Sequence, residues 1–137
     1  MTEFFRWILA LVTSVSVLWT TDARARTPIE RDLADFAIAS CLTKVDSPVL
    51  REQGQLWAGA IAQRSHGKIE IFQKVADVVF LDLEETGVAV GHGDNPTSDA
   101  NRPMPMLTCG EIVDRPVVLK AIGKAKASLR RAYRAGS

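Results

Sequence analysis

Apolar residues recur at helical spacing in five segments of this chain, and this spacing restricts the fold more than any other feature of the sequence. The clearest segment spans residues 68–85, where the apolar positions are Ile69, Phe72, Val75, Ala76, Val79, Phe80 and Leu83. Residues 78–81 favour β-structure taken alone, so a strand is the alternative there. The spacing continues on both sides over a length that suits a helix better, and Gly87 fits the end of such a helix.

Two earlier helices begin with a hydroxyl residue followed by proline. Thr27 and Pro28 precede Glu30 at the spacing of a capping box, in which two side chains satisfy free backbone groups of the first turn. Ser47 and Pro48 repeat this start ahead of a weaker apolar stripe. The five predicted helices therefore span residues 28–44, 48–64, 68–85, 106–113 and 116–133.

Five amphipathic helices without a convincing strand predict an all-α fold, a compact bundle in a single domain. Gly54 and Gly59 weaken the second helix but would let a neighbouring helix approach closely. Residues 87–105, between the third and fourth helices, are rich in glycine, proline, asparagine and aspartate and lack apolar periodicity. They predict a long polar loop with room for a short hairpin at its tip, either a binding loop or an insertion without a role.

Residues 1–25 have the pattern of a secretory signal peptide. A short segment with one cation precedes an uncharged, largely apolar run at 7–19, and the small residues Ala23 and Ala25 suit cleavage after Ala25. An uncleaved anchor is the alternative, but a membrane span needs about 20 predominantly apolar residues and this run is shorter. We therefore predict that residues 26–137 form the working domain, in the periplasm and without stable insertion in the membrane.

In an oxidising compartment outside the cytoplasm, two cysteines in a small domain are expected to form a disulfide. Cys41 and Cys109 are predicted to form one disulfide across 109 minus 41, or 68, residue steps. A cysteine–histidine nucleophile built with His66 or His92 is the enzymatic alternative. Each cysteine lies on the apolar stripe of its helix, and a disulfide sulfur cannot act as a nucleophile, so no catalytic residue is predicted.

Metal and nucleic-acid binding find little support in the sequence. His92, Asp94 and Asp99 could supply ligands to a metal, but aspartate among glycines more often forms turns, and no metal or other cofactor is predicted. The net charge of +1 gives no overall attraction to nucleic acid. The last helix has a basic outer face, which is either a solvated helix end or a patch for an acidic partner: Lys120, Lys124, Lys126, Arg130, Arg131 and Arg134.

Two cysteine-centred motifs resemble the type VI secretion amidase immunity proteins. FAIASCL at 36–42 places a cysteine late in the first helix, and MLTCGEIVD at 106–114 places the second in a short helix before the last one. The layout of residues 26–137 is also similar, with a final helix that ends near a tyrosine, here Tyr133. Thr108 departs from the pattern, because a basic residue is expected before the second cysteine.

The resemblance implies a function. Such proteins are periplasmic, all-helical and often dimeric, so a homodimer is possible. They protect a cell from an injected toxin, a peptidoglycan amidase with a papain-like cysteine–histidine site, by blocking that site sterically. The expected contacts lie in the 87–105 loop, with four polar contact residues: His92, Asp94, Asn95 and Arg102. A periplasmic structural or chaperone-like interaction protein is the alternative, followed by a small periplasmic hydrolase.

Overall fold

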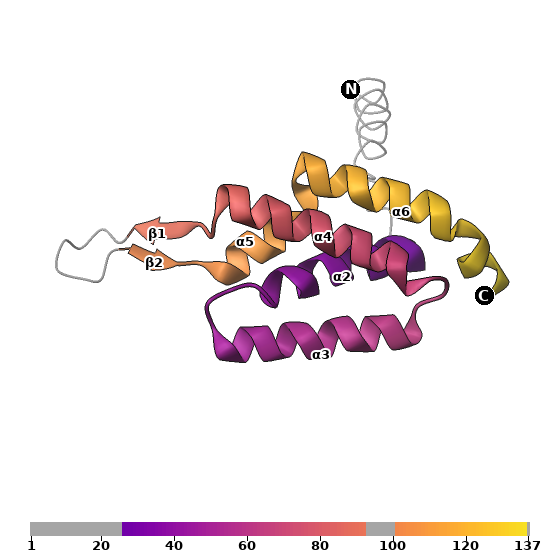
Figure 1. The fold of residues 1–137 in the computed structure, drawn as a ribbon, viewed down its shortest axis with the longest axis horizontal. Helices are drawn as coiled ribbons and strands as arrows, with labels where there is room; N and C mark the ends of the chain where they lie inside the picture. Colours follow the sequence, from indigo (N-terminus) through magenta and orange to yellow (C-terminus); the bar gives the residue numbers. More distant parts are fainter. Residues whose placement is uncertain (1–25, 93–100, 137) are drawn as a thin grey trace, which may run out of the picture.

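The computed structural model describes residues 26–92 and 101–136, which form a helical bundle with one small antiparallel sheet (Figure 1). The predicted all-α class is confirmed, since helices form most of the described body and each strand has three residues. In chain order the elements are α2 Pro28–Leu42, α3 Pro48–Arg64, α4 Ile69–Thr86, β1 Val90–His92, β2 Asn101–Pro103, α5 Pro105–Glu111, the 3-10 helix η1 Ile112–Asp114, and α6 Pro116–Ala135.

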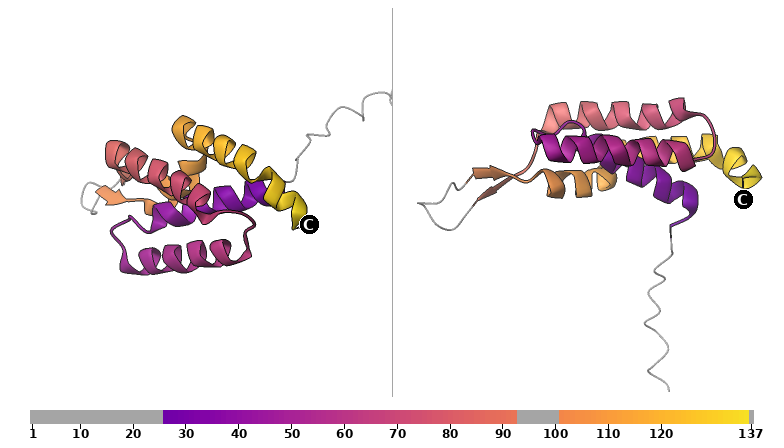
Figure 2. Two further views of the ribbon diagram at one scale, coloured as in Figure 1. Left: turned by 45° about the vertical axis from the view of Figure 1, so that its right-hand side comes forward. Right: turned by 90° about the horizontal axis from the view of Figure 1, so that it is seen from below.

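Helix α2 is the centre of the bundle. It contacts α3, α4, α5 and α6, and the left-hand view of Figure 2 shows it between α3 and α6. A helix surrounded in this way must be apolar on several faces, and its buried residues include Leu33, Ala37 and Ala39. The ring of Phe36 meets that of Phe72 in α4 edge-on, with ring centroids 5.3 Å apart. The core therefore forms around α2.

The close approach of α3 to α2 depends on Gly54. A Cβ atom on Gly54 would lie 2.7 Å from the carbonyl oxygen of Ala39 and 2.9 Å from Cβ of Leu42, so any larger residue would force the two helices apart. The close approach predicted for Gly54 is thus confirmed. The same prediction is wrong for Gly59, where an added Cβ would meet no other atom within 4 Å.

Helix α2 begins where its sequence predicts but ends earlier than predicted. Thr27 Oγ1 accepts a hydrogen bond from the backbone N–H of Glu30 at 3.4 Å, and Glu30 Oε2 accepts one from the N–H of Thr27 at 2.9 Å, which is the predicted capping box. The predicted end near Lys44 is two residues too late, because α2 ends at Leu42 and the Thr43 hydroxyl donates to a carbonyl of the last turn.

Within the segment predicted as a long loop, residues 90–92 and 101–103 form a short hairpin. Strands β1 and β2 pair antiparallel, with Val90 opposite Pro103 and His92 opposite Asn101. The sequence predicts a hairpin at the tip of this loop; the two strands lie on either side of residues 93–100, which are outside the described residues. The hairpin begins where α4 ends and extends away from the helical body, as Figure 1 and the right-hand view of Figure 2 show.

The predicted disulfide joins Cys41 at the end of α2 to Cys109 in α5, with the Cα atoms 5.5 Å apart. Both cysteines are buried. The helix predicted at 106–113 is divided into α5 and the short 3-10 helix η1. Because α5 begins directly after β2, the disulfide fixes the base of the hairpin to the central helix.

Candidate functional site

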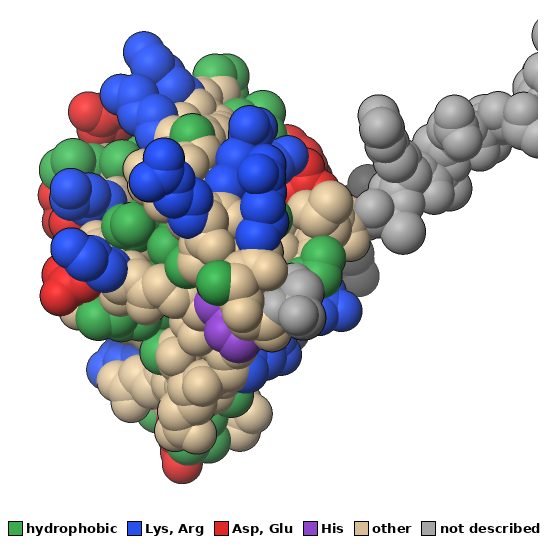
Figure 3. Space-filling model, turned by 90° about the vertical axis from the view of Figure 1, so that its right-hand side faces the viewer, with side chains coloured by type: hydrophobic (Ala, Val, Ile, Leu, Met, Phe, Trp, Pro, Cys, Tyr) green, Lys and Arg blue, Asp and Glu red, His purple; other side chains and the backbone are tan. Residues whose placement is uncertain are grey.

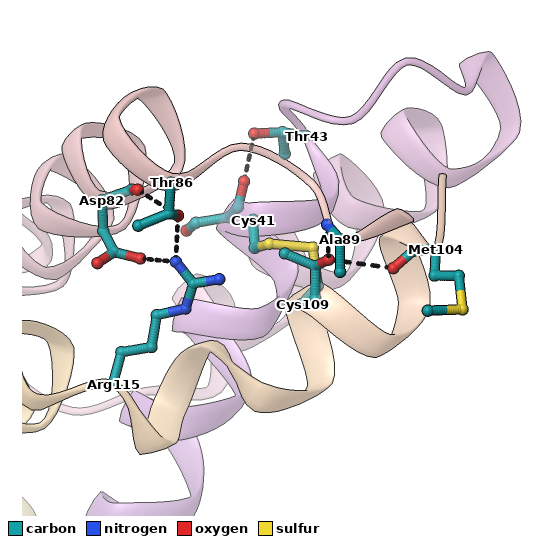
Figure 4. Close-up of a disulfide and its surroundings, with 10 residues drawn as sticks. Cys41, Thr43, Asp82, Thr86, Ala89, Met104, Cys109 and Arg115 are labelled. Carbon is teal, nitrogen blue, oxygen red and sulfur yellow. Dashed lines mark hydrogen bonds and ion pairs between the residues drawn. A yellow bond between two sulfur atoms is a disulfide. The ribbon is translucent and has the colours of Figure 1, made fainter. Parts of the chain in front are cut away.

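The hairpin is held at its base by a small network beside the disulfide, drawn in Figure 4. The backbone N–H of Met104 donates to the carbonyl of Ala89 at 2.7 Å, which continues the strand pairing toward the bundle. The backbone N–H of Ala89 donates to Thr108 Oγ1 at 2.9 Å, and the Thr108 hydroxyl donates to the Met104 carbonyl at 3.1 Å. Thr108 is buried next to Cys109, so both sides of the hairpin are tied to the disulfide-bonded helix.

A second group of contacts fixes the end of α4, from which the hairpin departs. Arg115 Nη1 donates to Oδ2 of Asp82 and to the Thr86 hydroxyl, and that hydroxyl donates to the Asp82 carbonyl at 2.7 Å (Figure 4). Asp82 is nearly buried, so the guanidinium offsets the cost of removing its carboxylate from water. Gly87 follows with φ of 70°, a left-handed backbone that glycine adopts without strain.

Gly91 and Met104 pack together across the stem. A Cβ atom on Gly91 would lie 3.0 Å from Sδ of Met104, so the methionine side chain rests against the glycine. A larger residue at position 91 would require Met104 to move. This contact gives the short two-stranded stem a packed side, which such a small hairpin needs in order to be stable.

Exposed apolar side chains surround the base of the hairpin. Val90 in β1 and Met106 and Leu107 in α5 are 46%, 61% and 44% exposed. Arg102 is also exposed, in β2 opposite Gly91. Methionine and arginine are enriched in protein-binding surfaces, whereas leucine and valine are not.

The predicted contact residues are placed only in part. His92 ends β1 and Arg102 lies in β2, so the strand pairing brings their backbones onto the same short ladder. Asp94 and Asn95 lie outside the described residues, as does Asp99, which the sequence offers only as a possible metal ligand. Sequence reasoning missed the supporting residues Thr108, Asp82 and Arg115. Thr108 stands out in the sequence only as a departure from the resembled motif, and nothing in the local pattern pairs positions 82 and 115.

Two polar contacts on other parts of α2 shift pKa values. The Tyr133 hydroxyl donates to Oδ2 of Asp32 at 2.8 Å, and burial together with this hydrogen bond raises the pKa of Tyr133. Arg64 forms an ion pair with the other oxygen of Asp32, with 3.0 Å between Nη2 and Oδ1. At the start of α2, a hydrogen bond from Lys126 and bonds from Thr27 lower the pKa of Glu30 to about 2. Both carboxylates join α2 to α6 and thus support the bundle.

The two cysteines and His66, which the sequence offers as possible catalytic residues, each contact another side chain. Both cysteines are in the disulfide. The His66 ring meets the Tyr133 ring edge-on, with centroids 5.4 Å apart. Within residues 26–92 and 101–136, no group of three or more His, Cys, Asp or Glu side chains is arranged to hold a metal ion. No helix in those ranges combines the length and apolar character needed to cross a membrane.

No protein-family model, no curated protein and no solved structure matches the chain.

Proposed function

We propose that this protein is a periplasmic immunity protein that binds a peptidoglycan-cleaving amidase and blocks its active-site cleft. The observation that carries the proposal is the hairpin, a narrow two-stranded stem that extends from a bundle held by the Cys41–Cys109 disulfide. Strands that are already paired before binding lose little conformational entropy when they bind, so more of their contact energy appears as affinity.

The two motifs that resemble the amidase immunity proteins support this proposal. Each motif, at 36–42 and at 106–114, contributes one cysteine to the disulfide. The signal peptide proposed at residues 1–25 would bring the protein to the periplasm, where peptidoglycan is cleaved.

The proposed mechanism is steric. An amidase with a papain-like site holds its cysteine and histidine in a cleft that receives the peptide stem of peptidoglycan. A hairpin two strands wide fits such a cleft and excludes the substrate without any chemistry of its own. In this proposal the apolar base of the hairpin packs on the rim of the cleft, while His92, Asp94, Asn95 and Arg102 make polar contacts with its walls.

The test begins with purified residues 26–137, which contain every described element. This protein is used to capture binding partners from the secreted and periplasmic proteins of its own organism, and any captured protein is assayed for peptidoglycan cleavage. We expect an amidase whose activity falls in proportion to the added protein and vanishes near a one-to-one ratio.

Two variants then test the hairpin. Replacement of residues 93–100 by a Gly-Ser segment of equal length, or Arg102→Ala, should weaken inhibition by about tenfold or more, as loss of a central contact does. Glu52→Ala, at an exposed position of α3, is the matched control and should inhibit like the wild type. Failure to capture any amidase would overturn the proposed function. Full inhibition by both hairpin variants would overturn only the role of the hairpin.

A further inference from the structure

The charges of this protein are strongly separated. Residues 116–135 of α6 contain six Lys and Arg side chains and no Asp or Glu. The whole chain has a net charge of +1, and residues 1–25 carry two cations and two anions, so residues 26–137 also have +1 and those outside α6 have 1 minus 6, or −5. Figure 3 shows the end of the molecule where α6 terminates, with Lys and Arg side chains gathered around apolar ones. A near-neutral protein therefore has one strongly basic helix.

An apolar groove of about 460 Å³ runs between α4 and this basic helix. Its floor includes Val75 and Ala125, which are buried, and its walls include Val78, Val117 and Ala121. Val117 is half exposed where α6 begins. The groove is thus an open apolar channel along two packed helices, formed by residues that do not belong to the hairpin.

Three lysines line the groove. Lys120 and Lys124 lie one helical turn apart on α6, and Lys74 comes from α4. In the described part of the chain, none of the three forms an ion pair. Lys126 of the same helix differs, because it does not line the groove and is paired with Glu30 in the first turn of α2. The carboxylates near Lys74 in the sequence, Glu70 and Asp77, are not among the residues that line the groove.

We propose that the groove between α4 and α6 docks an acidic amphipathic helix of a partner protein. Apolar side chains at helical spacing on that helix would enter the channel, and Asp or Glu residues beside them would meet Lys74, Lys120 and Lys124. The lysines give the site its specificity, since the apolar floor alone does not select a charge. This surface and the hairpin share no residue, so the proposal stands independently of amidase inhibition.

The charges and shape of the groove disfavour two other occupants. A second copy of this chain placed symmetrically on the groove would bring the lysines of the two copies together, and like charges repel. A membrane surface is contacted by apolar side chains that project outward. Of the apolar residues that line the groove, only Val117 is exposed, and Val75 and Ala125 are buried at its floor. A helix with acidic flanks satisfies both the concave apolar floor and the basic rim.

The probe for this site is a synthetic 18-residue helical peptide with leucine at i, i+3, i+4 and i+7 spacing and glutamate at the remaining positions. Binding to residues 26–137 is measured by fluorescence anisotropy, and the contact surface by amide chemical-shift changes. We expect shifts confined to α4 and α6, and no binding of the same peptide with lysine in place of glutamate.

A matched pair of variants separates the groove from the general charge of α6. Lys120→Glu with Lys124→Glu should weaken peptide binding by more than about tenfold, because two contacts become repulsive. Arg130→Glu with Arg131→Glu makes the same charge change at exposed positions of α6 that do not line the groove, and should weaken binding by less than about threefold. Equal loss in both variants, shifts outside α4 and α6, or binding only to phosphatidylglycerol vesicles would overturn the proposal.

Discussion

The hydroxyl of Thr108 accepts a hydrogen bond from the backbone N–H of Ala89. The residue directly before Cys109 is therefore bonded to the residue directly before strand β1. The same hydroxyl donates to the carbonyl of Met104, on the returning side of the hairpin. One buried side chain therefore links both sides of the stem to the disulfide-bonded helix. This arrangement gives the hairpin a defined direction relative to the bundle, which would lower the entropic cost of the binding proposed for it.

Replacing Thr108 by valine keeps the shape of the side chain but removes both hydrogen bonds. We expect the free energy of unfolding to fall by about 1 to 2 kcal/mol, because the Ala89 N–H loses its partner in a partly buried place. Hydrogen exchange at Ala89 should become faster. Thr43→Val is the control, since its hydroxyl bonds only within the end of α2, and it should leave exchange at Ala89 unchanged. Unaltered exchange in Thr108→Val would contradict the assigned link.

Removal of the disulfide should destabilise the whole bundle. The Cys41–Cys109 bond closes a loop of 68 residue steps, and the loss of chain entropy in the unfolded state predicts a contribution of about 4 kcal/mol. Urea unfolding of Cys41→Ala with Cys109→Ala should therefore have a much lower midpoint than the oxidised wild type. Reduced wild-type protein should behave like the variant. Equal midpoints for oxidised and reduced protein would contradict the predicted contribution of the bond to stability.

Helix starts were the most predictable part of the fold, because the signals for them are local. Thr27 and Glu30 cap each other within one turn, and the sequence alone indicates this pair. Strands β1 and β2 were predicted less well, since each has three residues and too few side chains to show alternation. Their position depends on contacts such as that of Met104 with Gly91, which the bundle sets.

Contacts in the candidate site could be predicted only where a residue had a single chemically possible partner in the sequence. Two cysteines in an exported chain can pair in one way, so Cys41 and Cys109 were paired correctly from the sequence. Arg115 had many carboxylates available, and its pairing with Asp82, 33 positions away, follows only from the packing of α4 near the start of α6. Side chains that support a site from a distance leave no local pattern for sequence analysis.

Replacing only one residue of the Arg115–Asp82 pair should lower the free energy of unfolding. Arg115→Met leaves the nearly buried carboxylate of Asp82 without its cation, so we expect a loss of about 2 to 3 kcal/mol in the free energy of unfolding. The double variant Arg115→Met with Asp82→Asn should recover part of this loss, because the uncompensated charge is gone. Urea unfolding of the four proteins in the cycle measures the coupling. A double variant as unstable as the sum of the two single variants would argue against direct pairing.

The pKa of Glu30 predicts one source of acid sensitivity. Its value in the folded protein, about 2, lies below the ordinary value of 4.5, so the ionised carboxylate favours the folded state. This stabilisation is complete above about pH 4.5 and is lost as the pH falls toward 2. Glu30→Gln should therefore be less stable than the wild type at neutral pH, and the two stabilities should converge as the pH approaches 2. NMR titration of the Glu30 carboxyl carbon measures the pKa directly, and a midpoint near 4.5 would show that the Lys126 and Thr27 contacts do not persist in solution.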